Sequence, residues 1–444
     1  MTRAGWAEIE ITPPLGLPMG GRGPRFAPGA EVLDQLRAQA LVLEDDDGRR
    51  QLWLSLDLIG MDHGRAAALR QTLAAVAGVP HAGVVLNFAH VHSGPMTNFH
   101  KYPPVMQEPE LLVAYHQSLA LALRRVVEEA LLAMQPVTVA WHSGTSDVGI
   151  NRRLRRSDGD MALAPNPDGV YNPDLWILDL QATEGMDRAI IFNYGCHPVI
   201  VYGFIWDGIS AGYPGVARRV LQERLIEEGS DAVHCQFIQG LAGNVRPRVL
   251  ADTEAGAFRK SRPEDVERAG TQLAEDVLTA IGQPGEELSL VLRATAGWIA
   301  PRRALDQAPS LDHWRAMAAQ DDELSRNVGR YWARRVTSGR PFPPVLPMEI
   351  GLLQIAEGHR VAWFNAEAVA EWMPLLRQAL DDPKLAVWGY CQEVATYLPT
   401  DALLPEGDYE VINANWYDAL GPAPFAPGID TTVREGFLEL WSRL

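Results

Sequence analysis

The segment AHVHSGP, residues 89–95, places two histidines two positions apart at the end of an apolar run. Residues 84–90 predict a β-strand, and side chains at positions i and i+2 of a strand point to the same side. We therefore expect His90 and His92 to leave the sheet together, where Ser93 opens a loop. Neutral imidazole is the commonest protein ligand for metals, so the pair predicts a metal site. The alternative is one buried and one exposed histidine beside a turn.

Other residues able to bind or react follow apolar strands in the same way. They are His197, the loop residues Asn244, Arg246 and Arg248, then Glu367, and finally Glu393 with Tyr397. In open α/β sheets, ligands bind where loops leave the carboxyl ends of strands. Gathered at one edge, these side chains would form a pocket of nitrogen and oxygen ligands. Each also has a structural alternative: a histidine bonded to backbone, a glutamate at a helix N-terminus, or a core tyrosine.

The elements that must position these residues alternate along the chain. Strands are predicted at 39–43, 51–58, 84–90, 137–141, 175–180, 189–194, 233–238, 351–355 and 361–365. Helices are predicted at 65–76, 109–134, 215–228, 263–281, 310–335 and 366–380. This order predicts an α/β fold with a layered mixed β-sheet core and flanking helices. We expect a single domain over residues 1–444, with residues 300–347 forming a lid or an insertion.

Composition limits the partners. The net charge of −17 over 444 residues argues against nucleic acid and against an anionic membrane surface. No apolar stretch is long enough to insert into a membrane, and the opening residues suggest a strand rather than a leader. The three cysteines lie far apart, which is typical of buried thiols. We expect a cytoplasmic protein that acts on a small-molecule substrate, and a homo-oligomer remains open.

Taken in order, the motifs resemble those of the neutral/alkaline (non-lysosomal) ceramidases, in their catalytic N-terminal domain and their short bacterial relatives. The resemblance covers nearly the whole chain. It rests on AHVHSGP, INRR (150–153), NYGCHPV, ISAGYPG (209–215), QGLAGNVRP, FNAE and ATYLPT. AHVHSGP is the most specific of these motifs, and the others count through their order. The resemblance implies a ceramidase catalytic-domain-like α/β fold.

The resemblance also implies a zinc site with one ion per chain. Carried over residue by residue, it gives His90, His197, Glu367 and Tyr397 as the metal ligands. Tyr397 is the weakest of these matches, because Val394 stands where a second family tyrosine would lie. Nitrogen and oxygen donors with an open position suit a hydrolytic zinc ion. Manganese or iron would accept similar ligands.

Catalytic candidates follow from the same comparison. His92 would act as a general acid–base or contact an oxyanion, Arg152 would line the pocket, and Arg246 would stabilise negative charge or anchor substrate. Arg246 stands where ceramidases carry a serine implicated in catalysis, and arginine is neither a nucleophile nor a proton acceptor. Asn244 replaces an aspartate of the family, and Gly212 replaces another acid. We therefore expect an activity other than true ceramide hydrolysis.

The arginines suggest the kind of substrate. Arg153 belongs to the run RRLRR at 152–156, which we expect in a loop, and Arg248 lies close to Arg246 in sequence. Guanidinium groups bind carboxylate or phosphate through paired donors. We therefore expect Arg153, Asn244 and Arg248 to bind a small polar, anionic substrate. The alternative for RRLRR is a solvated surface run.

Together these features predict an amidase-like, zinc-dependent hydrolase of an amide or related acyl bond. Two other functions fit the same residues. One is a metal-assisted lyase or isomerase acting on a hydroxy acid or a sugar acid. The other is a non-catalytic ligand-binding relative.

Overall fold

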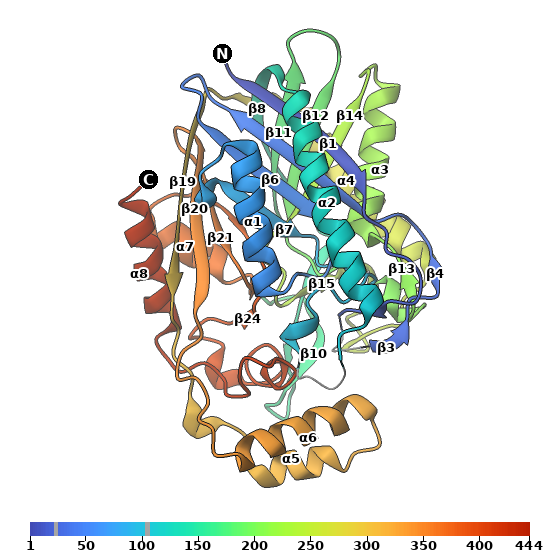
Figure 1. The fold of residues 1–444 in the computed structure, drawn as a ribbon, viewed down its shortest axis with the longest axis vertical. Helices are drawn as coiled ribbons and strands as arrows, with labels where there is room; N and C mark the ends of the chain where they lie inside the picture. Colours follow the sequence, from blue (N-terminus) through green and yellow to red (C-terminus); the bar gives the residue numbers. More distant parts are fainter. Residues whose placement is uncertain (22–24, 103–106) are drawn as a thin grey trace.

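The computed structural model describes residues 1–21, 25–102 and 107–444. Its largest element is a mixed β-sheet that runs through the middle of the molecule (Figure 1). The sheet has the spatial order β14 (Val233–Gln239), β12 (Arg188–Tyr194), β11 (Asp174–Ala182), β8 (Gln135–Thr145), β1 (Arg3–Glu10), β5 (Arg37–Glu44), β6 (Arg50–Leu56) and β7 (Val84–Phe88). The two edge pairs, β6 with β7 and β12 with β14, are parallel, and the neighbours between them are antiparallel.

The two edge strands of this sheet lie close together. Asn87 of β7 donates to the carbonyl oxygen of Gln239 in β14 at 3.2 Å and accepts the Gln239 backbone N–H at 2.8 Å. The Gln239 side chain donates to the carbonyl oxygens of Ala89 and Cys196, each at 3.1 Å. The segments that follow β7, β12 and β14 therefore begin next to one another. These segments carry most of the polar residues that the sequence singles out.

A second sheet packs against one face of the first. It contains β19 (Leu290–Ile299), β20 (Met348–Ala356), β21 (His359–Phe364) and β23 (Ala386–Trp388). Trp53 and Trp176 of the first sheet contact Trp388 of the second, with ring centroids 5.1 and 5.6 Å apart. Trp363 belongs to the same buried cluster. Large aromatic side chains dominate core energetics, so this contact fixes how the two sheets pack.

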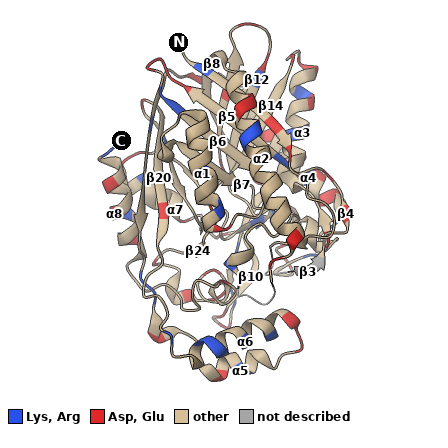
Figure 2. Ribbon diagram, in the orientation of Figure 1, with Lys and Arg blue, Asp and Glu red and all other residues tan. Residues whose placement is uncertain are grey.

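Helices cover the outer faces of the two sheets (Figure 1). On the first sheet lie α1 (His63–Ala77), α2 (Glu110–Leu132), α3 (Gly212–Glu227) and α4 (Pro263–Ile281), and on the second lie α7 (Trp372–Ala379) and α8 (Ile429–Trp441). The outward side of α2 carries charged side chains, including the ion pairs Arg124–Glu128 and Arg125–Glu129 (Figure 2). No helix in the described part of the chain combines the length and apolarity needed to cross a membrane. The predicted α/β class with mixed sheets and flanking helices is confirmed.

Several predicted elements have nearly the expected bounds. The helix predicted at 65–76 is α1, and it ends at Gly78, whose φ of 63° is left-handed and suits glycine. The helix predicted at 263–281 is α4 with the same bounds. The cysteines are buried thiols, as expected: Cys196, Cys235 and Cys391. Local stop signals in the sequence therefore located these ends well.

The helix predicted at 310–335 is instead a hairpin of two helices, α5 (Leu311–Ala318) and α6 (Glu323–Thr337). Ser310 and Asp322 each accept a backbone N–H at the start of one helix, which favours two separate starts. The hairpin lies at one end of the molecule (Figure 1). Its apolar side chains form a cluster of their own, centred on Trp314, Met317, Val328 and Trp332. It belongs to residues 300–347, the segment expected to be a lid or an insertion.

Two further predicted elements differ from the structure. The arginine run at 152–156 lies largely in strand β9 (Gly149–Arg155) rather than in a loop, because β9 pairs with β10 (Met161–Asn166) and β15 (Val245–Pro247). The helix predicted from residue 366 begins only at Trp372. Before it, the short strand β22 (Glu367–Ala368) pairs in parallel with β24 (Tyr397–Leu398). Tertiary pairing overrides the local pattern at both places.

Candidate active site

The backbone at His90 differs from the expected extended strand. Strand β7 ends at Phe88, and His90 has a φ of 63°, in the left-handed region that non-glycine residues rarely adopt. Such a conformation costs about 1–3 kcal/mol and persists where the surrounding structure holds it. Here the His90 backbone N–H donates to the carbonyl oxygen of Leu58 at 3.0 Å. The prediction that strand alternation aligns His90 with His92 is therefore wrong in its cause, although the two rings do lie together.

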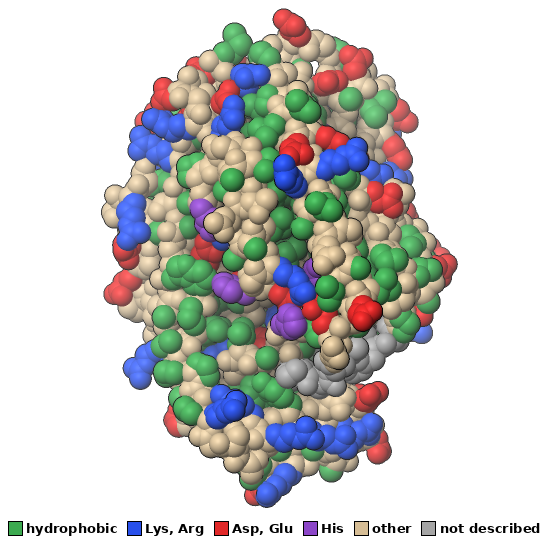
Figure 3. All heavy atoms as spheres, in the orientation of Figure 1, with side chains coloured by type: hydrophobic (Ala, Val, Ile, Leu, Met, Phe, Trp, Pro, Cys, Tyr) green, Lys and Arg blue, Asp and Glu red, His purple; other side chains and the backbone are tan. Residues whose placement is uncertain are grey.

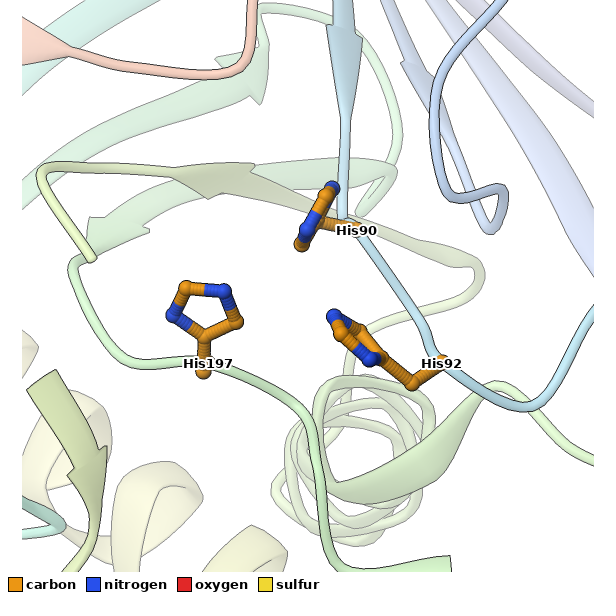
Figure 4. Close-up of side chains that lie close together, drawn as sticks. All are labelled: His90, His92 and His197. Carbon is orange, nitrogen blue, oxygen red and sulfur yellow. The ribbon is translucent and has the colours of Figure 1, made fainter. Parts of the chain in front are cut away.

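Three buried imidazoles converge at this point (Figure 4). His197 follows β12, and its ring centroid lies 5.2 Å from that of His90 and 5.5 Å from that of His92. The centroids of His90 and His92 are 4.9 Å apart. One ring nitrogen from each histidine lies within 4.8 Å of the others. The structure thus brings together the two histidine motifs found far apart in the sequence.

Backbone carbonyl groups fix the orientation of two of these rings. Nδ1 of His90 lies 2.6 Å from the carbonyl oxygen of Ile59, and Nδ1 of His197 lies 2.6 Å from that of Ala242. A carbonyl oxygen only accepts, so each Nδ1 carries the proton and each Nε2 keeps a lone pair. This tautomer is the one in which a histidine binds a metal through Nε2.

Glu367 and Tyr397 supply oxygen atoms beside these nitrogens. Oε2 of Glu367 lies 3.2 Å from Nε2 of His90 and 3.3 Å from Nε2 of His197. The hydroxyl of Tyr397 lies 3.4 Å from Nε2 of His197. Four tetrahedral ligands about 2.0–2.1 Å from zinc lie about 3.3–3.4 Å from one another. The donor set and its spacing therefore fit a zinc ion.

Burial and neighbouring charges set the protonation of this group. Burial, reinforced by Arg152, lowers the pKa of His197 to about 4, so its imidazole is neutral at pH 7. Burial opposes ionisation of Glu367, but a protonated His90, in the metal-free site, and Lys101 outweigh burial and hold the pKa of Glu367 well below its usual range. Neutral imidazole and ionised carboxylate are the forms that bind a metal.

Arg152 contacts the site through Tyr397. Its guanidinium donates to the Tyr397 hydroxyl at 3.1 Å and, through Nε, to Glu410 at 2.8 Å. It also lies over the rings of Tyr397 and Tyr409, 5.7 and 5.6 Å from their centroids. Arg152, Tyr397 and Glu410 are buried, and Tyr409 is half-buried. Arg152 thus holds the phenol of Tyr397 in place while Glu410 balances its charge.

A cavity of about 200 Å³ opens in front of these donors. Its described lining is Gly21, Ile59, His90, His92, Asn98, Lys101, Tyr102, Leu324, Glu367, Tyr397, Tyr409, Ala414, Tyr417 and Asp418. Leu324 comes from helix α6, so the α5–α6 hairpin forms part of the wall. The lining is rich in tyrosine and carries charge of both signs, which suits a small polar ligand.

Sequence reasoning missed several of these residues. Lys101 lies 3.3 Å from Oε1 of Glu367 and 3.9 Å from Oδ1 of Asp418. Tyr390 packs its ring 4.5 Å from that of His90. Glu410 pairs with Arg152. Lys101 alone could have been suspected, because it follows the AHVHSGP motif by a few residues, but no spacing rule assigns it to Glu367.

Three residues expected to bind substrate have other contacts. Arg153 donates to Glu410 at 2.6 Å and to Glu406 at 3.1 Å. The Asn244 amide donates to Glu371 at 2.8 Å, and its oxygen accepts the Ala370 backbone N–H at 2.9 Å. Arg248 donates to the Asp147 carbonyl oxygen and lies over the Tyr171 ring. Within the described lining, none of the three faces the cavity. Internal pairing, rather than substrate, accounts for these donors.

Arg246 contacts the site indirectly, through Tyr202. Its guanidinium lies 4.8 Å from the centroid of the Phe258 ring, and one of its nitrogens lies 3.5 Å from the Tyr202 hydroxyl. The Tyr202 ring stacks on His92, with centroids 5.7 Å apart and an interplanar angle of 29°. Arg246 therefore reaches His92 through Tyr202 and is not part of the described cavity lining.

Solved structures of ceramidases share this architecture. The neutral ceramidase from Pseudomonas aeruginosa superposes with a TM-score of 0.73 at 18% identity, covering 99% of this chain and 74% of that one. A ceramidase complexed with C2 gives a TM-score of 0.71 at 16% identity, covering 100% of this chain and 75% of the other. No protein-family model and no curated protein matches the chain. The chain therefore has the neutral ceramidase-like α/β fold.

Proposed function

We propose that this protein is a zinc-dependent hydrolase of an amide or related acyl bond in a small polar substrate. The observation that carries the proposal is the set of donor atoms from His90, His197, Glu367 and Tyr397, of which Nε2 of His197 lies 3.3 and 3.4 Å from the two oxygens. The likeness of the fold to neutral ceramidases supports a hydrolase. The arginine at position 246 argues for an activity other than ceramide hydrolysis, because the family serine is replaced.

The residues around the donors would keep the centre rigid. A zinc ion bound there would supply Lewis acidity, which polarises an acyl carbonyl and acidifies water. Hydrogen bonds to backbone carbonyl oxygens prevent the rings of His90 and His197 from turning. Lys101 holds Oε1 of Glu367, which leaves Oε2 directed at the histidines. A preorganised set of this kind avoids reorganisation during the reaction.

His92 is the residue we propose for proton transfer or for contact with a developing oxyanion. It lines the cavity and lies beside His90 and His197. The rings of those two histidines are held by the carbonyl oxygens of Ile59 and Ala242. Tyr202 stacks on its ring, and Arg246 lies behind Tyr202. We therefore assign Arg246 to positioning His92, and Arg152 to positioning Tyr397.

The size and lining of the cavity support a small polar substrate. Its volume of about 200 Å³ is below the range of about 300–1,000 Å³ that is typical of pockets for drug-sized ligands. In the described wall the cation is Lys101, which Glu367 and Asp418 already neutralise, so this lining supports a polar substrate rather than one bound through a free cation. The arginines first expected to bind such a group are paired with internal carboxylates instead.

The test is metal content and turnover of the purified chain. We expect zinc in the wild type and hydrolysis of short N-acyl amino acids, with one oxygen atom from labelled water in the acid product. His90→Ala and His197→Ala should each lose the cavity zinc together with activity. Stoichiometric zinc retained at the cavity in both variants would contradict the proposal. Turnover without incorporation of solvent oxygen would favour the lyase or isomerase alternative, and zinc-free, inactive protein would favour a ligand-binding relative.

A further inference from the structure

A second group of metal-binding side chains lies near the ends of α1 and α2, outside the cavity lining. Asp62 precedes α1, His100 lies in the 3₁₀ turn Phe99–Lys101, Glu108 precedes α2, and His116 lies on α2. Donor atoms of Asp62, His100 and Glu108 lie within 4.8 Å of one another. Figure 3 shows histidine, acidic and basic side chains together on this face of the molecule. We propose that this group binds a second divalent ion, zinc or a similar borderline metal, through His116, Glu108 and His100.

The strongest evidence is a buried pair of polar atoms. His116 is 8% exposed, and its Nε2 has no hydrogen-bond partner among the described residues. The same holds for Oε1 of Glu108, which lies 3.8 Å from Nε2 of His116. Each buried polar atom left unsatisfied costs about 1–3 kcal/mol. The structure therefore calls for a third group between them.

The separation of these two atoms favours a metal ion over a water molecule. A water that bridges two groups through bonds of about 2.8 Å at a tetrahedral angle leaves them about 4.5 Å apart. Two tetrahedral zinc ligands lie about 3.3–3.4 Å apart. The observed 3.8 Å is closer to the zinc value. Nε2 of His100 lies 3.4 Å from the other oxygen of the same carboxylate, Oε2, which places a second imidazole beside the pair.

Arg65 contacts both acids but leaves Oε1 of Glu108, the oxygen beside His116, without a donor. It donates to Oδ2 of Asp62 at 2.5 Å and to Oε2 of Glu108 at 2.8 Å. Oδ1 of Asp62 accepts the His100 backbone N–H at 2.7 Å, which holds the turn of His100 beside the group. The carboxylates of Asp62 and Glu108 carry two negative charges and Arg65 carries one positive charge, so the three side chains together have a net charge of about −1, which favours a cation. A surface groove lined by Arg65 and His116 gives a route for an ion.

Another histidine in the chain shows that the distance alone does not make a site. Nε2 of His142 also lies 3.8 Å from a carboxylate oxygen, Oδ2 of Asp179. Both oxygens of Asp179, however, accept guanidinium bonds from Arg188, at 2.9 and 2.7 Å. Neither oxygen of Asp179 is therefore left unsatisfied, in contrast to Oε1 of Glu108. His142 therefore serves as the matched control for His116.

The test titrates the full, metal-stripped chain with Zn²⁺ in a background of His90→Ala and His197→Ala, which removes two donors from the cavity. We expect this background to bind one zinc ion per chain and to melt at a higher temperature with zinc. Adding His116→Gln should weaken binding about tenfold or more and abolish the shift in melting temperature. Adding His142→Gln should leave both unchanged.

The proposal is overturned if the background binds no zinc, or if His116→Gln leaves its zinc affinity unchanged. If circular dichroism shows the background to be unfolded, the wild type and His116→Gln are compared instead. Two ions in the wild type against one in the variant support the second site, and equal numbers overturn it. Failure of the cavity proposal looks different: the wild type then binds one ion that His116→Gln removes and His90→Ala keeps.

Discussion

Glu367 and Tyr397 face each other as register partners in the parallel pair of β22 and β24. The Glu367 backbone N–H donates to the Thr396 carbonyl oxygen at 2.9 Å, which fixes this register. As a result, the carboxylate and the phenol both approach Nε2 of His197, at 3.3 and 3.4 Å. The short pairing of β22 with β24 thus places both oxygen donors of the proposed zinc site side by side, although they come from separate parts of the chain.

The left-handed backbone at His90 allows ligand loss to be separated from misfolding. His90→Gly removes the imidazole but relieves the strain of φ 63°, so we expect it to fold at least as well as His90→Ala. Both variants should lose the cavity zinc and lower kcat/KM by at least about a hundredfold. Metal analysis, circular dichroism and kinetics would check this. Activity retained in the folded glycine variant would contradict the role of His90, and His81→Ala, on the surface, is the control.

The buried pair of Arg152 and Glu410 should be more costly to break than an exposed pair on the same strand. Arg152→Met leaves the Glu410 carboxylate with Arg153 as its remaining cation and removes the bond to Tyr397. We expect a loss of about 3 kcal/mol in the free energy of unfolding. Arg155→Met, which breaks an exposed pair with Glu406, should cost less than about 1 kcal/mol. Urea unfolding would measure both, and equal losses would contradict the buried role.

How far the sequence predicts the site depends on the range of the contacts involved. The segments holding His90, His197, Glu367 and Tyr397 could be found because each motif follows or lies within a local strand pattern. The position of Lys101 could not, because its approach to Glu367 depends on tertiary packing of a short turn.

The arginines show the same limit. The sequence predicts that Arg153 faces substrate, because it gives no sign that Glu410, far along the chain, neutralises this arginine. The split of the predicted helix at 310–335 could have been found, because Asp322 followed by a helical pattern is a start signal. Local signals therefore predict elements, and pairings between distant charges require the structure.

A buried histidine away from the cavity should make the protein less stable in acid. Burial, reinforced by Arg218, lowers the pKa of His234 to about 4, against 6.5 in an exposed position. The unfolded chain therefore takes up a proton near pH 6.5 and the folded chain only near pH 4. The contribution of the neutral, buried His234 to the free energy of unfolding is therefore complete above pH 6.5, and it falls by about 3 kcal/mol toward pH 4.

Replacing this histidine should flatten the pH profile. In His234→Gln, the free energy of unfolding should decline less steeply between pH 6.5 and 4. The slope of the free energy against pH should fall by the amount that corresponds to the uptake of about one proton on unfolding. Urea unfolding at several pH values would measure the slope. A His234→Gln profile that parallels the wild type would show that His234 titrates alike in both states.

The side chain of Leu324 should influence which substrates enter the cavity. It is the residue of the α5–α6 hairpin in the described cavity lining, and the indole N–H of Trp332 fastens the hairpin to the Trp416 carbonyl oxygen at 2.7 Å. Leu324→Ala would enlarge the cavity, so we expect kcat/KM to shift toward longer acyl groups, by about tenfold per one or two added methylenes. Leu324→Trp should shift it toward the shortest acyl groups. Val328→Ala, inside the hairpin cluster and away from the described lining, is the control and should leave the preference unchanged. Identical chain-length profiles in all the variants would show that the hairpin does not limit substrate size.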